Sequence, residues 1–435
     1  MDPLMIGILG ICVMCVLMFL GVHIGIAMFI TGFVGFGLIV DFKAALGILK
    51  TTPFTNASNY AFTVIPLFVL MGQFAFHSGL SRDLYEASYK WLSRLPGGMA
   101  VATIGACAGF SAICGSSPAT AATMGTVALP EMKKFKYADT LACGSVAAGG
   151  TLGILIPPSV GFILYGIITQ QSIGQLFAAG VVPGILLALL FAVAIMIMAW
   201  RNPRLGPVGP KFTWREKFAS LKNLWGVVLL FGLIIGGMFG GVFTANEAAA
   251  AGAFLAMLYM IVRGRMNRKT FMAAVTGTVS TTAMIMLILI GAYVFGYFLT
   301  VSRIPTALAD FVTGLDVSRY VVLAAIILLY IVLGCIMDAL AMILLTIPIF
   351  LPIMTALDFD PIWLGVIAVL AMEQGLITPP VGLNVYIVSG VARDVPIHTI
   401  FKGIFPFWLC IILLIALLAA FPEIALWLPG LLFRN

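Results

Sequence analysis

Two pairs of consecutive prolines, each inside a long apolar stretch, constrain this chain more than any other feature. They are Pro157-Pro158 and Pro379-Pro380. A helix that meets two prolines loses backbone hydrogen bonds and breaks. In hydrocarbon the freed carbonyl groups are costly unless they line a cavity or bind something. Two interrupted membrane helices, one in each half of a chain, are typical of the binding site of a secondary transporter.

The apolar runs around these prolines place the chain in a lipid bilayer. Hydrophobic residues make up 62% of the 435 residues and charged residues 9%, whereas soluble domains carry roughly 25% charged residues. The runs are continuous, so they do not fit the alternating segments that build a membrane β-barrel. We therefore predict an all-α polytopic membrane protein.

The net charge of +7 comes from 23 basic and 16 acidic residues. Many of the basic residues gather in short loops. One such loop, 201–222, has six basic residues and a single acid, Glu216. Loops of this kind mark the cytoplasmic side of a membrane protein. We therefore expect a lipid bilayer around the chain and no nucleic acid partner.

Similar segments recur at a constant distance along the chain. Pro157-Pro158 returns as Pro379-Pro380 (379 − 157 = 222), and Leu129-Pro130 returns as Leu351-Pro352 at the same offset (351 − 129 = 222). Shared offsets between such landmarks indicate an internal duplication. We predict two repeats, residues 1–222 and 223–435, each with its own scaffold helices.

Each repeat contains a stretch that is interrupted by a polar tip. In residues 97–130 the tip is Cys114-Gly115-Ser116-Ser117-Pro118, and neither flanking apolar run reaches the roughly 20 residues that a span needs. A re-entrant helical hairpin explains this pattern better than one kinked helix, which is the alternative. The second hairpin is then 320–354, with its tip near 334–338. A helix broken at Pro-Pro follows each hairpin, at 140–168 and 361–391.

The charges of the loops predict opposite orientations for the two repeats. The loops that flank the first hairpin are basic, and those that flank the second are rich in aspartate. The first hairpin then opens to the cytoplasm and the second to the outside, so the repeats have inverted topology. Both chain ends fall on the outer side.

Asp338 is the acid with the strongest claim to a transport role. Nothing else between Leu333 and Leu345 is charged. A carboxylate in mid-membrane costs roughly 2.5–3.5 kcal/mol on insertion scales and needs a partner, for which a cation is the obvious choice. A helix cap at the hairpin tip is a second interpretation, compatible with the first. Three roles stay open for Glu373, close to the second break: ion ligand, helix cap or ion-pair partner.

The residues around the breaks predict two sodium sites. Neutral oxygen ligands with one carboxylate suit a hard cation, and no His/Cys cluster is present to suit zinc or iron. Sodium fits better than a proton, because the first set has no titratable group. The alternative is that these small residues only allow close helix packing. The predicted ligands are Ser116, Gly149, Gly150, Thr151 and Gly153 in the first set, and Asp338, Gln374, Gly375 and Thr378 in the second.

The helix breaks also favour an anionic substrate. Helix N-termini at the two tips and after the two breaks would point the positive ends of their dipoles at the centre of the molecule. The side chains predicted to hydrogen-bond the substrate are Ser117, Thr120, Ser159 and Asn384. No Arg or Lys lies inside these elements.

The chain resembles a known transporter family. The residues that carry the resemblance are the hairpin segment 115–123, Leu155-Ile156-Pro157-Pro158-Ser159 and the segment 375–384, which ends in Pro379-Pro380-Val381-Gly382-Leu383-Asn384. Together they are similar to the DctM-type large permease subunit of TRAP (tripartite ATP-independent periplasmic) transporters. The wider resemblance is to the ion transporter superfamily, which includes sodium/dicarboxylate symporters.

The resemblance implies a function beyond what the residues themselves show. Such subunits are multi-pass proteins of the bacterial inner membrane and are not enzymes. They work with a small four-helix membrane subunit and a periplasmic substrate-binding protein. They import carboxylate substrates of the C4-dicarboxylate or sialic acid class, driven by sodium, through an elevator mechanism. The sodium sites carry over to Ser116 with 149–153 and to Asp338 with 374–378.

The remaining expectations concern partners and alternatives. The chain has no four-helix extension fused at its start, so we expect the small subunit to be a separate chain. We expect no cofactor, with Na⁺ as the coupling ion. A stand-alone sodium/dicarboxylate symporter of the same superfamily is the alternative function.

Overall fold

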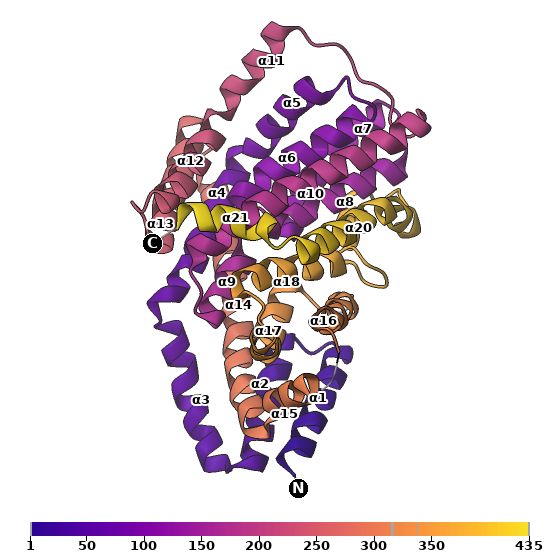
Figure 1. Cartoon of the computed structure of the whole chain (residues 1–435). Coiled ribbons are helices and arrows are strands. Elements are labelled where there is room, and N and C mark those ends of the chain that lie inside the picture. The colour runs from indigo at the N-terminus through magenta and orange to yellow at the C-terminus, as the bar shows by residue number, and fades with distance from the viewer. Residues whose placement is uncertain (1, 315–316, 336, 434–435) are drawn as a thin grey trace.

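The computed structural model describes residues 2–314, 317–335 and 337–433, and this part of the chain is helical with no strand (Figure 1). Among these residues, eight helical segments are long and apolar enough to cross a membrane. The prediction of an all-α polytopic membrane protein is therefore confirmed.

One group of helices forms a scaffold that draws on both halves of the chain. Helix α2 packs along α14, and α13 packs along α4. Contact between α2 and α14 is close because Gly25 and Gly291 meet there, where a Cβ on Gly291 would lie 2.1 Å from the Gly25 carbonyl oxygen. The scaffold helices are α1 (Pro3–Phe19), α2 (Ile24–Ile39), α3 (Phe42–Ala57), α4 (Val64–Ser78), α12 (Trp225–Phe239), α13 (Ala245–Val262) and α14 (Arg268–Ser302), with a short 3-10 helix η1 (Tyr60–Thr63) before α4.

The first hairpin consists of α6 (Gly98–Cys114) and α7 (Ser117–Lys134). Gly115 makes the turn with a φ of +63°, a conformation that favours glycine. Ser116 caps α7, its hydroxyl oxygen accepting a long hydrogen bond from the Ala119 N–H at 3.5 Å. The helices around this hairpin are α5 (Leu80–Leu92), α8 (Asp139–Leu155), α9 (Val160–Thr169) and α10 (Ile173–Arg201).

The helix of the first half is interrupted at its proline pair. Helix α8 ends at Leu155 and α9 begins at Val160, and the Pro157-Pro158 peptide bond is cis. The side-chain oxygen of Ser159 accepts a hydrogen bond from the Phe162 N–H and so caps α9. The break therefore lies where the proline pair predicts it.

The second half repeats this order of helices. The second hairpin consists of α16 (Arg319–Gly334) and α17 (Ala339–Ala356), and Ile336 in its predicted tip lies outside the described residues. The second interrupted helix consists of α18 (Pro361–Gly375) and α19 (Leu383–Val391), with a cis Pro379-Pro380 bond between them. The neighbouring helices are α15 (Ile304–Thr313), α20 (Ile397–Ala420) and α21 (Glu423–Leu432).

The helix starts of the two halves keep the offset seen in the sequence. This holds for α7 and α17 (339 − 117 = 222) and for α8 and α18 (361 − 139 = 222). The packing is also exchanged between halves: α9 lies against α17, and α19 lies against α7. The inverted orientation, the boundary between the two repeats and the position of both ends outside the cell stay predictions.

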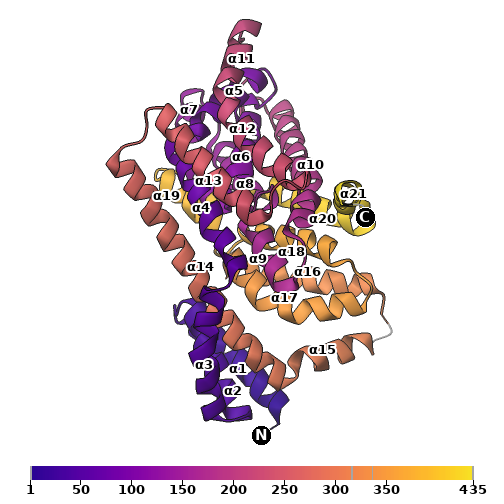
Figure 2. The same ribbon diagram turned by 90° about the vertical axis from the view of Figure 1, so that its left-hand side faces the viewer.

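Figures 1 and 2 place the interrupted helices in the middle of the molecule. Helices α1–α3 lie at one end, together with the end of α14. Helices α5 and α11 (Trp214–Leu221) lie at the opposite end. Helix α11 continues through the 3-10 helix η2 (Lys222–Leu224) into α12. The candidate site is thus built from the central helices, between the scaffold and the two hairpins.

Candidate functional site

The tip of the first hairpin lies directly on the first interrupted helix. A Cβ on Gly153 of α8 would lie 2.6 Å from the carbonyl oxygen of Ser116, and one on Gly115 would lie 2.7 Å from the carbonyl oxygen of Pro158. Neither position has room for a side chain. The hairpin tip and the break are therefore one packed unit.

The second hairpin meets the second break through equivalent residues. A Cβ on Gly375, at the end of α18, would lie 2.3 Å from the Cα of Gly334 at the end of α16. Gly375 corresponds to Gly153 (375 − 153 = 222), and Asp338 corresponds to Ser116 (338 − 116 = 222). Asp338 caps α17 as Ser116 caps α7, its carboxylate accepting from the Ala341 N–H at 3.4 Å.

Both caps line one cavity of about 380 Å³, large enough for a small organic anion. Asp338 is the one ionisable carboxylate among the described residues of its lining, and neither Arg nor Lys is among them. Gln73 of α4 and Thr281 of α14 contribute polar side chains from the scaffold. The cavity therefore lies between the two hairpin tips and the scaffold.

Three helices begin at this cavity. Ser116 and Ala119 belong to the start of α7, Asp338 and Leu340 to the start of α17, and Val160 is the first residue of α9. The first N–H groups of a helix have no partner within it, and the helix dipole adds partial positive charge there. A carboxylate in this cavity would face three such N-termini.

The predicted ligands of the first sodium site are only partly brought together. Gly153 touches Ser116, whereas Gly149 faces the Cys107 side chain on α6 and Gly150 faces Ala121 on α7. All four predicted residues on α8 lie in helix, since α8 continues to Leu155. The hydroxyl of Thr151 donates to the Ala148 carbonyl of its own helix at 2.7 Å.

The predicted ligands of the second sodium site divide between two places. Asp338 lines the cavity, whereas Gln374, Gly375 and Thr378 lie at the end of α18 and in the break. The Thr378 hydroxyl donates to the Gln374 carbonyl oxygen at 2.6 Å and accepts from the indole N–H of Trp408 on α20 at 3.0 Å. Gly375 connects the two places by its contact with the hairpin.

The four predicted substrate residues are all buried, and each side chain has a partner within the protein. Thr120 donates to the Ser116 carbonyl oxygen at 2.9 Å, and Ser159 caps α9. The Asn384 amide of α19 donates to the Ala147 carbonyl oxygen of α8 at 3.3 Å. None of the four lines the cavity, whereas their neighbour Ser116 does.

Ser117 joins the two halves of the chain. Its hydroxyl donates to the Glu373 carboxylate at 2.6 Å across 256 residues of sequence. Glu373 is 1% exposed and its second oxygen has no hydrogen-bond partner. Both side-chain polar atoms of Gln374 and the side-chain amide oxygen of Asn384 are also buried without a partner. Buried oxygens of this kind are suited to an ion or a proton.

The sequence leaves three residues at the site without a definite role. It leaves Glu373 open between ligand, cap and ion-pair partner, and the bond from Ser117 to Glu373 spans too much of the chain to be found by spacing. Gln73 and Thr281 receive no role from the sequence patterns above. Gln73 does carry a signal, because an amide inside an otherwise apolar span is costly unless it faces a cavity or a partner.

Comparison with known proteins decides the family. Residues 11–424 match the family described as the tripartite ATP-independent periplasmic transporter, DctM component. The C4-dicarboxylate TRAP transporter large permease protein DctM of Pseudomonas aeruginosa is 38% identical over 380 residues, which cover 87% of this chain and 88% of that protein. This chain belongs to the TRAP transporter large permease family. As a TRAP permease it is a multi-pass membrane transporter and not an enzyme.

One further relative agrees with this assignment, and one solved structure shares the fold. The sialic acid TRAP transporter large permease protein SiaM of Vibrio cholerae is 34% identical over 409 residues, covering 92% of this chain and 95% of SiaM. The crystal structure of the Alcanivorax borkumensis YdaH transporter superposes with a TM-score of 0.63 and 17% identity, covering 88% of this chain and 89% of YdaH. This likeness concerns the fold alone.

Proposed function

We propose that this TRAP permease imports an organic acid anion across the bacterial inner membrane, coupled to sodium. A periplasmic substrate-binding protein delivers the anion, and a small four-helix membrane subunit completes the transporter. The observation that carries the proposal is the single cavity shared by the two hairpin tips, with Ser116 and Asp338 at matching positions.

Sodium is the coupling ion that suits this arrangement best. The groups around the tips are carbonyl, hydroxyl and amide oxygens with one carboxylate in the cavity, the donor set that hard cations prefer. The unpartnered oxygens of Glu373, Gln374 and Asn384 lie in the same central helices and fit the same chemistry. Asp338 would neutralise part of the charge that sodium brings into the membrane.

The substrate class follows from the charge around the cavity. Three helix N-termini favour an anion, and the cavity volume of about 380 Å³ admits a small organic acid. The relatives named above are a C4-dicarboxylate and a sialic acid permease. We therefore infer a carboxylate of the C4-dicarboxylate or sialic acid class, held by helix N-termini and neutral donors.

The packing supports an elevator mechanism. The two hairpins pack on the two interrupted helices, and α9 and α19 each contact the hairpin of the other half, so these elements form one block. Within the scaffold, α2 with α14 and α4 with α13 make more extensive contacts than the scaffold makes with this block. Movement of the block against the scaffold would carry both hairpin tips and both breaks across the membrane together, while Gln73 and Thr281 stay with the scaffold.

The decisive experiment is uptake of labelled organic acids into proteoliposomes with an imposed sodium gradient. We expect uptake only when the permease, the small subunit and the loaded binding protein are all present, and only with sodium outside. Equal uptake with a potassium gradient would refute sodium coupling. Uptake by the permease alone would favour a stand-alone sodium/dicarboxylate symporter, which the family assignment does not favour.

A further inference from the structure

The segment that joins the two halves, residues 201–222, has a charge that the transport site does not use. It carries six basic residues, Arg201, Arg204, Lys211, Arg215, Lys217 and Lys222, against Glu216. Its helix α11 lies beside α5, at the end of the molecule opposite α1–α3 (Figures 1 and 2). This segment therefore places an excess of five positive charges (6 − 1 = 5) at that end of the protein.

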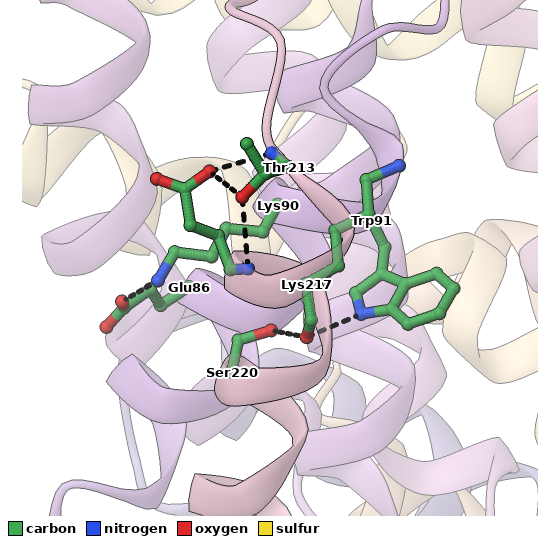
Figure 3. Close-up of polar contacts among 7 residues, drawn as sticks. Glu86, Lys90, Trp91, Thr213, Lys217 and Ser220 are labelled. Atoms are coloured by element: carbon green, nitrogen blue, oxygen red, sulfur yellow. Dashed lines mark hydrogen bonds and ion pairs between the residues drawn. The ribbon is translucent and has the colours of Figure 1, made fainter.

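The single acid of the segment is engaged within its own helix. The Glu216 carboxylate accepts hydrogen bonds from the backbone N–H and the hydroxyl of Thr213, both at 2.7 Å, which closes a capping box (Figure 3). Among the described residues, none of the six basic side chains forms a salt bridge. Five of them are exposed, Lys217 being the exception.

Lys217 instead attaches α11 to α5. Its ammonium group lies over the rings of Trp91 and Trp214, 5.7 and 5.1 Å from their centroids. The Trp91 indole N–H donates to the Lys217 carbonyl oxygen at 3.2 Å, which Ser220 also contacts through its hydroxyl (Figure 3). These contacts hold α11 on α5 and leave the remaining basic side chains exposed.

The same helix exposes large aromatic side chains. Trp214 is 68% exposed and Phe218 57%, and their rings stack one helical turn apart. Trp225, at the start of α12, is exposed as well. Exposed aromatic rings are costly in water but favourable at the boundary between headgroups and acyl chains, where Trp is enriched in membrane proteins.

We propose that α11 binds the anionic phospholipids of the cytoplasmic leaflet, with Trp214 and Phe218 at the headgroup–acyl boundary and Lys211, Arg215 and Lys222 on the phosphates. Unpaired basic residues next to exposed aromatic residues are complementary to an anionic lipid surface. Helix α11 leads into α12 of the scaffold and packs on α5, beside the first hairpin. Binding of lipid to α11 would therefore hold this end of the scaffold at the membrane surface.

Hydrogen exchange in nanodiscs tests this proposal without any transport measurement, so its failure is separate from failure of the proposed function. The permease is placed in nanodiscs of phosphatidylcholine alone or with phosphatidylglycerol. We expect amide exchange in 211–222 to slow by about fivefold or more with phosphatidylglycerol, the effect of roughly one basic residue near an anionic surface. High potassium chloride should reduce the difference.

Variants identify the side chains that cause the slower exchange in nanodiscs with phosphatidylglycerol. Lys211→Gln/Arg215→Gln/Lys222→Gln should abolish the difference, since the three neutral amides lose the attraction to anionic phosphates. The matched control Lys43→Gln/Lys50→Gln, on exposed positions of α3 at the opposite end of the molecule, should leave it unchanged. Full protection in the triple variant would overturn the proposal.

Added probes separate a lipid surface from other anions. Glycerol phosphate added to phosphatidylcholine nanodiscs should give no protection, because a free phosphate offers no surface for the aromatic rings. Protection by soluble polyglutamate but not by phosphatidylglycerol would indicate an acidic protein partner and overturn the proposal. Equal exchange in the two lipid compositions would do the same.

Discussion

Substitution of Gly153 by Ala tests the contact on which the proposed first sodium site depends. The added Cβ would lie 2.6 Å from the carbonyl carbon and oxygen of Ser116 and from the Ser117 nitrogen, whereas ordinary contact begins at 3.4 Å. The hairpin tip must therefore retreat by about 0.8 Å, the difference between the two values. All three atoms belong to the backbone, so no rotamer change can relieve the overlap.

The expected magnitude follows from the cost of overpacking. Extra methyl groups in a packed core cost roughly 1–3 kcal/mol. If that cost falls on the conformation that binds sodium, the apparent affinity for sodium drops by roughly 5- to 150-fold, since every 1.4 kcal/mol is tenfold. The helix propensity of Ala acts in the opposite direction by up to about 1 kcal/mol.

Gly232→Ala provides the matched control. Gly232 is also helical, on α12, but no atom lies within 4 Å of its added Cβ. The control gains the same propensity without the overlap, so its sodium dependence should equal that of the parent. The assay is initial uptake against sodium concentration in proteoliposomes, with thermal unfolding of both variants measured in parallel. A Gly153→Ala variant with unchanged sodium dependence would refute the placement of the site at this tip.

Three further variants probe the site and its surroundings. Asp338→Asn should weaken the apparent affinity for sodium, and an unchanged sodium titration would remove Asp338 from the ion site. Ser117→Ala should lower the melting temperature because it leaves the buried Glu373 carboxyl without its donor, a loss of roughly 1–3 kcal/mol, and a melting temperature equal to the parent's would contradict this contact. Lys133 lowers the pKa of the exposed Asp394 carboxyl through a hydrogen bond, so the pair stabilises the fold above the unfolded pKa of about 3.9 and loses this effect as pH falls through the lower folded pKa. Asp394→Asn should therefore lower the melting temperature slightly at pH 7, and this difference should shrink as pH falls below the unfolded pKa of about 3.9; a difference that stays constant would refute it.

The sequence predicted the interruptions of the helices because proline acts locally. Two prolines remove hydrogen bonds wherever they lie, so the breaks after Leu155 and after Gly375 follow from the chain itself. The hairpin turns are similarly local, since Gly115 supplies a positive φ and Ser116 a helix cap. The constant offset between the two halves then extends each local prediction from one half to the other.

Contacts between the halves could not be predicted in this way. The bond from Ser117 to Glu373 depends on how α7 and α18 pack, which no local pattern encodes. The position of Gly149 is a second example: it shares a sequence motif and a helix face with Gly153, but it lies about one turn further from the tip and meets α6 instead. Sequence proximity to a break is therefore a weaker guide than contact with the hairpin tip.

Binding of radioactive ²²Na⁺ to the purified permease is the most direct measurement of whether the two hairpin tips hold the coupling ion. The structure predicts saturable binding that is weakened by Asp338→Asn and by Gly153→Ala and retained in Gly232→Ala. Absence of saturable binding by folded protein, or binding that is equal in all four proteins, would contradict it.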